Sequence, residues 1–321
     1  MIGASVAAHN SLHMQNILLY LVTVLIWGST WFAIEFQLGE VAIEVSLFYR
    51  FVIAAVLMWL FCWWRRLDMR FSLAQHGFIL LLAALNFALN FLLIYQAQQY
   101  LTSAMTAIAF TTMLLMNIIN TRLFFGAPVA KRIYFGALLG IAGIVVLFWP
   151  DLNGIDLTNT SLLGLLLILA GALSASFGNM VSVRNSRQGM PITQVNAWGM
   201  LYGSILLGLA AWAKGDTFNF STEPAYIMSL LYLAIFGSVI AFASYFALLK
   251  KIGPEKASYT IVLFPLVAVI LSTLFEGFIW TGYTFAGFTL VLLGNILVLT
   301  PFARIKALLL KHKAQPGLVA P

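Results

Sequence analysis

The chain has 321 residues, of which 62% are hydrophobic and only 8% are charged, and its mean hydropathy is +0.98. A soluble globular domain carries about 25% charged residues, so this composition excludes an ordinary soluble fold and predicts an integral membrane protein. The net charge of +7 does not indicate nucleic-acid binding, because nearly all of it lies in loops that the sequence places on one side of a membrane. The expected partners are a lipid bilayer and a small-molecule solute, with no nucleic acid.

Ten apolar segments approach the length of about 20 residues that a transmembrane helix needs. They cover residues 17–35, 45–64, 77–97, 101–123, 132–149, 161–182, 193–213, 226–249, 256–276 and 282–301. No basic region precedes the first segment, so we expect a retained span rather than a signal peptide. The sequence therefore predicts an all-α integral membrane protein with ten transmembrane helices, followed by a basic cytoplasmic tail at 302–321.

The basic residues agree with this number of spans through the positive-inside rule. All of the 17 Lys and Arg residues except Lys214 and Arg50 fall in loops, or in the tail, on the side that would hold both termini. Acidic residues predominate in the loops of the opposite side. We therefore expect a multi-pass protein of a bacterial inner (plasma) membrane, with the N- and C-termini in the cytoplasm.

The ten spans divide into two halves of five, at 17–149 and 161–301. Because five is odd, the second half would enter the membrane from the opposite side. The segments 132–148 and 283–299 align, with Gly136 matched to Gly287 and Gly143 to Gly294. Inverted repeats of this kind recur in transporters, where one half rocks against the other around a midplane site.

Two matching hairpins, at 90–113 and 243–266, differ in the charge of their turns. The first turn is uncharged and rich in glutamine, whereas the second carries Lys250, Lys251, Glu255 and Lys256. This difference predicts that the two turns lie on opposite sides of the membrane.

The chain resembles the EamA-type branch of the drug/metabolite transporter superfamily. The motifs that carry this resemblance are LIWGSTWFAIE at the start, FYRF in the second span, the hairpins LTSAMTAIAF and GPEKASYTIVLFPLVAVIL, and GFTLVLLGNILVL at the end. The resemblance covers residues 17–301 and implies a ten-helix inner-membrane carrier with a central cavity between its halves. Members of this family move amino acids, amines, nucleosides or other metabolites, many of them outward.

One departure from the family pattern concerns a Gly-Glu pair that is common after the fourth helix of each repeat. The first repeat reads FFGAPV without an acid, and the second reads FEGF, with Glu276 before Gly277. We therefore assign no coupling role to these positions by analogy.

Polar and aromatic side chains within the spans are the candidate substrate-binding residues, because polar groups in hydrocarbon are costly unless they face protein or water. Asn86 and Asn90 share one helical face, and their amides would suit a zwitterionic or hydrogen-bonding solute. Trp27 and Trp31 share another face and would stack on a planar ring or hold a cation. The alternative for each is helix–helix packing. The further candidates are Tyr95, Asn179, Tyr202, Phe242 and Tyr245.

Glu35 and Arg50 are the two charges expected to enter the bilayer, both near its outer side. A pair between them would lower the cost of burying each, and an outer gate sensitive to protons or substrate is the functional interpretation. The alternative is two interfacial charges that reach water. Pro265 lies in the middle of a span, where it would kink the helix.

Other features bear on the class of function. The single Cys62 excludes an intramolecular disulfide, and the four histidines lack ligand-like spacing, so we expect no metal and no cofactor. We expect a transporter, not an enzyme, which exports an amino acid, amine or similar solute by alternating access. A membrane-embedded enzyme acting on a lipid or isoprenoid, or a channel, stays the alternative, although the acids are scattered singly. One chain contains both repeats, so a monomer would suffice.

Overall fold

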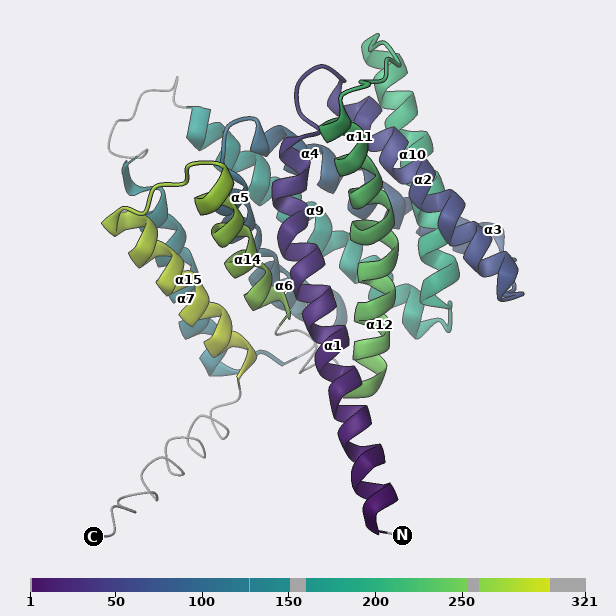
Figure 1. The fold of residues 1–321 in the computed structure, drawn as a ribbon, viewed down its shortest axis with the longest axis horizontal. Helices are drawn as coiled ribbons and strands as arrows, with labels where there is room; N and C mark the ends of the chain where they lie inside the picture. The colour runs from purple at the N-terminus through teal and green to yellow at the C-terminus, as the bar shows by residue number, and fades with distance from the viewer. Residues whose placement is uncertain (1, 127, 151–159, 253–259, 301–321) are drawn as a thin grey trace.

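The computed structural model describes residues 2–126, 128–150, 160–252 and 260–300, and its regular elements in these ranges are all helices (Figure 1). In chain order they are α1 (Ile2–Glu35), α2 (Ile43–Trp64), α3 (Leu73–Leu82), η1 (Ala83–Leu89), α4 (Asn90–Gln98), α5 (Ser103–Phe110), α6 (Met113–Phe125), α7 (Lys131–Leu147), α9 (Thr160–Arg187), α10 (Ile192–Lys214), α11 (Pro224–Leu231), η2 (Tyr232–Ile240), α12 (Ala241–Ile252), α14 (Thr260–Phe275) and α15 (Gly282–Leu299). The all-α prediction is confirmed for the described residues.

Each predicted span overlaps one helix or a run of consecutive helices. Eight segments are long and apolar enough to cross a membrane. The other two predicted spans fall on shorter helices, since α7 has 17 residues and α14 has 16. The number of ten spans therefore stays a prediction, and the predicted tail at 302–321 lies outside the described residues.

Polar side chains lie inside this helix bundle and large apolar side chains lie on its surface. Trp63 and Trp212 are 78% and 74% exposed, while Ser46 and Thr106 have no exposed surface. In a bilayer the surrounding acyl chains solvate such an apolar surface, and each helix pairs its own backbone N–H and C=O groups. The distribution of side chains therefore fits an integral membrane protein.

The segments that connect the helices lie at two ends of the bundle, and these ends differ in charge. At one end, the Asn219 side chain donates to Glu40 O at 3.3 Å. At the other end, Arg132 donates to Val298 O at 2.6 Å. The described basic residues of this second end are Arg65, Arg66, Arg70, Arg122, Lys131, Arg132, Arg184, Arg187 and Lys251.

Helices α7 and α15 lie side by side at one edge of the bundle and pack through glycines (Figure 1). A Cβ atom on Gly136 would lie 2.7 Å from Gly294 O, and one on Gly143 would lie 2.8 Å from Gly287 O. Residue numbers rise along α7 while those of the partners fall along α15, so the two helices are antiparallel. Small residues permit this close approach, which is a common source of helix association in membranes.

This contact predicts that Gly143→Leu destabilises the protein. A side chain at this position would meet backbone atoms of α15, so we expect a loss of about 1–3 kcal/mol, as for other overpacked interiors. The measurement is the apparent Tm of the purified protein, followed by tryptophan fluorescence. Gly77→Leu in α3 is the matched control, because a Cβ on Gly77 meets nothing within 4 Å. An equal Tm in the two variants would contradict the close packing.

Candidate functional site

The third helical run in each half of the chain contains a π-helical stretch. η1 lies between α3 and α4, and η2 lies between α11 and α12. At the ends of these stretches, Asn90 N donates to Leu85 O and Ala241 N donates to Phe236 O, in both cases five residues back. Such stretches within α-helices are rare and frequently lie at functional sites. The candidate site is therefore built around η1 and η2.

Trp27 of α1 lies against η2 and α12. Its Nε1 donates to Gly237 O at 3.3 Å. Its ring centroid lies 5.3 Å from that of Phe242 and 5.1 Å from that of Tyr245. These three predicted site residues are half-buried, and the structure brings them together. They form an aromatic group beside a π-helical backbone.

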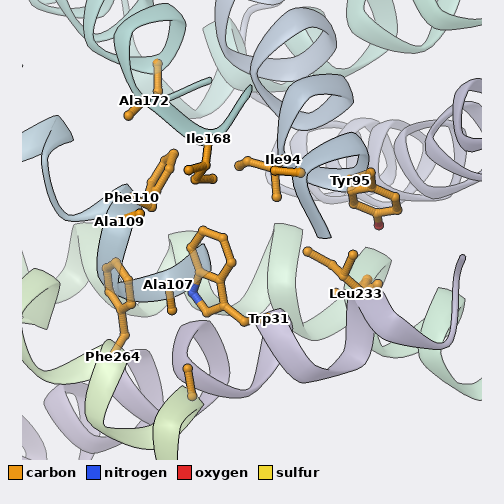
Figure 2. Close-up of a cluster of buried hydrophobic side chains, with 14 of the residues drawn as sticks. Trp31, Ile94, Tyr95, Ala107, Ala109, Phe110, Ile168, Ala172, Leu233 and Phe264 are labelled. Carbon is orange, nitrogen blue, oxygen red and sulfur yellow. The ribbon is translucent and has the colours of Figure 1, made fainter. Parts of the chain in front are cut away.

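Trp31, one turn along α1, has a different environment, since only 6% of it is exposed. Its centroid lies 5.2 Å from that of Phe110 and 6.0 Å from that of Phe264. Figure 2 shows the indole among these rings and Ile168. Gln98 Nε2 also donates to Trp31 O at 2.9 Å. Trp31 therefore belongs to the packed core, which is the alternative interpretation of this residue.

Arg50 of α2 is buried, with 2% of it exposed. Its Nη1 donates to Tyr95 Oη at 3.1 Å, and its Nε and Nη2 each lie 3.4 Å from Ser238 Oγ. Its Cζ lies 4.5 Å from the centroid of the Phe91 ring. Tyr95 is fully buried and lies at the edge of the cluster labelled in Figure 2, near Leu233. The guanidinium thus joins α2, α4 and η2.

The structure does not form the predicted pair between Glu35 and Arg50. Arg50 is bonded to hydroxyl groups in the interior, whereas Glu35 is exposed at the end of α1. Glu35 instead lines a cavity of about 290 Å³ at the less basic end of the bundle. The other lining residues of this cavity are Gln98, Gln99, Tyr100, Leu101, Thr102 and Glu276.

Two residues of this cavity, Glu276 and Gln98, make hydrogen bonds within the protein and each keep one oxygen atom without a partner. Glu276 Oε2 accepts from Ser103 N at 3.0 Å and from Ser272 Oγ at 2.7 Å. It therefore places a carboxylate at the N-terminus of α5, where the helix dipole stabilises it. Its Oε1 and the Oε1 of Gln98 are buried without a hydrogen-bond partner. The cavity is thus lined by residues that carry carboxylate, amide and hydroxyl groups.

A chain of asparagine amides links the first-half helices to α9. Asn86 Nδ2 donates to Asn179 Oδ1 at 3.4 Å, and Asn179 Nδ2 donates to Asn117 Oδ1 at 3.2 Å. Asn90 is 5% exposed, and its Oδ1 has no partner. Bonds between Asn86 and its neighbours favour interhelical contact for that residue, while Asn90 keeps a free acceptor.

Tyr202 lies in a different group from Trp27. Its hydroxyl is 2.9 Å from His76 Nδ1, and its ring centroid is 5.4 Å from that of Trp198. Trp198 in turn donates to Met69 O at the basic end of the bundle. Tyr202 therefore packs with His76 and Trp198 and does not belong to the aromatic group around Trp27.

Pro265 is buried within α14, and the structure assigns helix on both sides of it. The kink at Pro265 stays a prediction. The first half has an interruption between α5 and α6, at Thr111 and Thr112. The two hydroxyls donate to Ile108 O and Ala109 O, three residues back. Such side-chain bonds compete with the regular helix pattern, so threonines mark the break in the first half.

Sequence reasoning missed both π-helical stretches and the residues Gly237 and Phe91. No composition or spacing in the sequence distinguishes a π turn from an α turn. For Gly237 a signal existed. The offset of 151 residues that matches Gly136 to Gly287 also matches Asn86 to Gly237.

The asparagine chain yields a prediction for stability. In a double-mutant cycle, Asn86→Ala and Asn179→Ala are expected to be non-additive in the free energy of unfolding by about 0.6 kcal/mol, a typical value for polar contacts between membrane helices. The control cycle combines Asn86→Ala with Asn120→Ala, because Asn120 bonds separately to Ser176 at 2.8 Å. Additivity in both cycles would show that the amide contact contributes nothing.

Comparison with known proteins places this helical arrangement in a family. The model of the EamA-like transporter family matches residues 14–149 and 162–300. The chain is 30% identical over 253 residues to the "Uncharacterized inner membrane transporter YedA" of Escherichia coli K12, covering 78% of this chain and 79% of that protein. It is 26% identical over 268 residues to "Protein PagO" of Salmonella typhimurium, covering 81% and 85%.

A solved crystal structure shares the fold, with a TM-score of 0.64 at 18% identity, covering 94% of this chain and 99% of that one. The names of the family and of the relatives indicate a transporter rather than an enzyme. The resemblance seen in the sequence motifs is confirmed: the chain belongs to the EamA-like transporter family.

Proposed function

We propose that this protein carries a small metabolite across the inner membrane by alternating access, and that it is built from two inverted five-helix repeats at 17–149 and 161–301. The substrate would bind between the repeats, beside η1 and η2. The observation that carries this proposal is that the contacts between the two halves occur in matched pairs under a single offset of 151 residues.

The helix contacts are matched first at the level of whole elements. α1 contacts α14, and its counterpart α9 contacts α5 and α6. α1 also contacts η2 and α12, while α9 contacts η1 and α4. α2 contacts its counterpart α10, and α7 contacts its counterpart α15. This pattern is what a two-fold axis between the halves would generate, and the antiparallel glycine contact of α7 and α15 supports an axis in the membrane plane.

The matching extends to individual residues. Trp27 donates to Gly237 O, and the same offset turns this pair into Gly178 and Asn86. A Cβ atom on Gly178 would collide with the Asn86 side chain, so the second pair is also in close contact. In each pair a glycine contacts a larger residue. The glycine lies in the π-helical stretch in the first pair, as Gly237 of η2, and in the first helix of its half in the second pair, as Gly178 of α9. The offset likewise carries η1 onto 234–240, which lies inside η2.

Charge supports the orientation of the proposed repeats. The basic residues gather at one end of the bundle, and the positive-inside rule assigns that end to the cytoplasm. Both termini would then be cytoplasmic, and the polar cavity at Glu35 and Glu276 would open toward the periplasm. The relative YedA is named an inner membrane transporter, which supports the same membrane for this chain.

The residues around η1 and η2 support a small solute as cargo. Trp27, Phe242 and Tyr245 form an aromatic group, and Asn90 has a buried, unpaired amide oxygen. An amino acid, an amine or a similar metabolite combines the apolar and hydrogen-bonding groups that such residues bind. For the direction of transport we propose export, following the family resemblance of the motifs.

The topology is tested by labelling single cysteines in a Cys62→Ser background. Gln99 and Lys251 are both exposed, and they lie in the turns of the two matching hairpins. A membrane-impermeant maleimide should label Gln99→Cys in intact spheroplasts and Lys251→Cys only after permeabilisation. Labelling of both from one side would contradict the inverted repeats, while blocking by a permeant maleimide verifies that each thiol can react.

Alternating access is tested in proteoliposomes with a panel of amino acids, amines and other metabolites. We expect saturable counterflow of at least one labelled solute above the level in protein-free vesicles.

Glu35→Cys with Glu276→Cys places two thiols in one cavity, on α1 and after α14. A short bis-maleimide should then reduce flux nearly to background, because the cross-link prevents α1 and the end of α14 from moving apart at this cavity. The two single-cysteine variants, treated alike, are the controls. Unchanged flux in the cross-linked double variant would exclude movement at this cavity, and flux that grows linearly with concentration would indicate a channel.

A further inference from the structure

Arg50 is a cation in the interior of the bundle with no carboxylate beside it. The ion pairs among the described residues join Lys214 to Glu44 at 3.1 Å and to Asp216 at 3.8 Å, and none involves Arg50. At 1.5 Å per residue, Arg50 lies about 10 Å along α2 from the start of that helix. A guanidinium does not lose its proton in proteins. The charge therefore persists at this depth, and a charge within a membrane span ordinarily has a partner.

The partners that the chain itself offers are neutral and incomplete. Tyr95 accepts one bond at 3.1 Å, and Ser238 Oγ lies at 3.4 Å from two of the nitrogens. The rings of Phe91 and Phe51 lie 4.5 and 5.4 Å from Cζ and provide cation–π attraction. A guanidinium has five N–H donors in a planar fork. Three contacts, two of them long, leave it able to bind a stronger acceptor.

The opposite repeat shows that the fold does not require a charge in this environment. The offset of 151 residues matches Arg50 to Leu201 and Ser238 to Phe87. Leu201 packs against the buried apolar core to which Phe87 belongs. Leu201 and Phe87 thus place apolar side chains where the first half has Arg50 and the second has Ser238. A residue that only joined these helices would not need to be an arginine.

We propose that Arg50 binds the carboxylate of the transported solute, so that the substrate is a small carboxylate-bearing metabolite. This inference rests on the proposed carrier function. A carboxylate matches the guanidinium fork in two parallel hydrogen bonds and supplies the missing negative charge. Tyr95 and Ser238 hold the fork in place when no solute is bound.

The neighbouring aromatic group indicates the rest of the substrate. A Cβ atom on Gly237 would lie 3.7 Å from Arg50 Nη2, and Trp27 donates to the carbonyl of the same glycine. Gly237 is therefore a common neighbour of the guanidinium and of Trp27, whose ring packs against Phe242 and Tyr245. A solute whose carboxylate binds Arg50 would place an apolar or aromatic remainder against these rings. Amino acids with apolar side chains and simple carboxylic acids have this shape.

The test uses matched sets of solutes that differ only in their charged groups. One set is phenylalanine, phenylalaninamide, 2-phenylethylamine and 3-phenylpropionate, and a second set is the corresponding leucine series. Affinity is measured from the dependence of Tm on solute concentration, together with competition for counterflow in proteoliposomes. We expect the carboxylate-bearing solutes to bind about tenfold or more tightly than the amide and the amine, as expected for a charge-assisted bond.

Variants assign this preference to the guanidinium. Arg50→Gln should abolish the preference for acid over amide, and Arg50→Lys should keep only part of it, because an ammonium lacks the planar fork. Lys214→Gln is the matched control, since it removes a cation that already has the acidic partner Glu44. It should keep the full preference. If Arg50→Gln does not fold, the comparison of the wild-type protein with Arg50→Lys decides.

The outcomes separate this inference from the carrier function. Equal binding of acid and amide by the wild-type protein, or an unchanged preference in a folded Arg50→Gln variant, would overturn the role of Arg50. If amines or neutral solutes are carried and no carboxylate is, the carrier proposal stands and the inference is wrong. If no solute of the wider metabolite panel crosses faster than in protein-free vesicles, both are wrong.

Discussion

The structure depends on one constraint, which is that backbone N–H and C=O groups inside a bilayer must find partners within the protein. Each helix pairs its own backbone groups and so satisfies this constraint. The helices must therefore associate through side-chain packing and a few polar contacts. Glycines therefore set where the backbones meet. Gly143 and Gly287 bring α7 and α15 together, and Gly28 brings α1 against Phe264 and Val267 of α14. The apolar surface needs no other explanation than the lipid around it.

The two π-helical stretches depart from this regular pairing at equivalent places. Ser238 Oγ bonds to Leu233 O, five residues back, and Ser174 Oγ of α9 bonds to Leu85 O of η1 at 2.8 Å. Hydroxyl groups thus supply additional donors to carbonyls within the π stretches. A departure that needs such compensation in both halves supports the proposed site between them, because π-helical stretches frequently lie at functional sites.

The sequence predicted the helices well because span length and loop charge are strong, local signals. The ranges 45–64 and 193–213 fall within α2 and α10. Side-chain environments were less predictable, since the i, i+4 spacing of Trp27 and Trp31 gives one face of α1 but not its neighbours. η2 and α12 cover the first indole, and Phe110 and Phe264 enclose the second. This distinction depends on contacts between segments that are far apart in the chain.

The candidate pair of Glu35 and Arg50 is not formed, for the same reason. A short loop joins α1 to α2, so the two residues are near in sequence. Arg50, however, lies two turns inside α2 and faces α4 and η2. A helix turns about 100° per residue, so nearness in sequence does not fix the direction of a side chain. Only the tertiary arrangement reveals that the arginine has hydroxyl neighbours.

Function in this fold is best sought where the two halves differ, because their common features are explained by the scaffold. The glycines of α7 and α15 correspond to one another, and so do the π-helical stretches. Arg50, Ser238 and Trp27 have the counterparts Leu201, Phe87 and Gly178. The proposed two-fold scaffold would permit two conformations of similar energy, which alternating access needs. The side chains that differ between the halves would then give that scaffold a chemical preference. Arg50 is the strongest of these differences, because neither hydrocarbon nor neutral side chains can neutralise its charge.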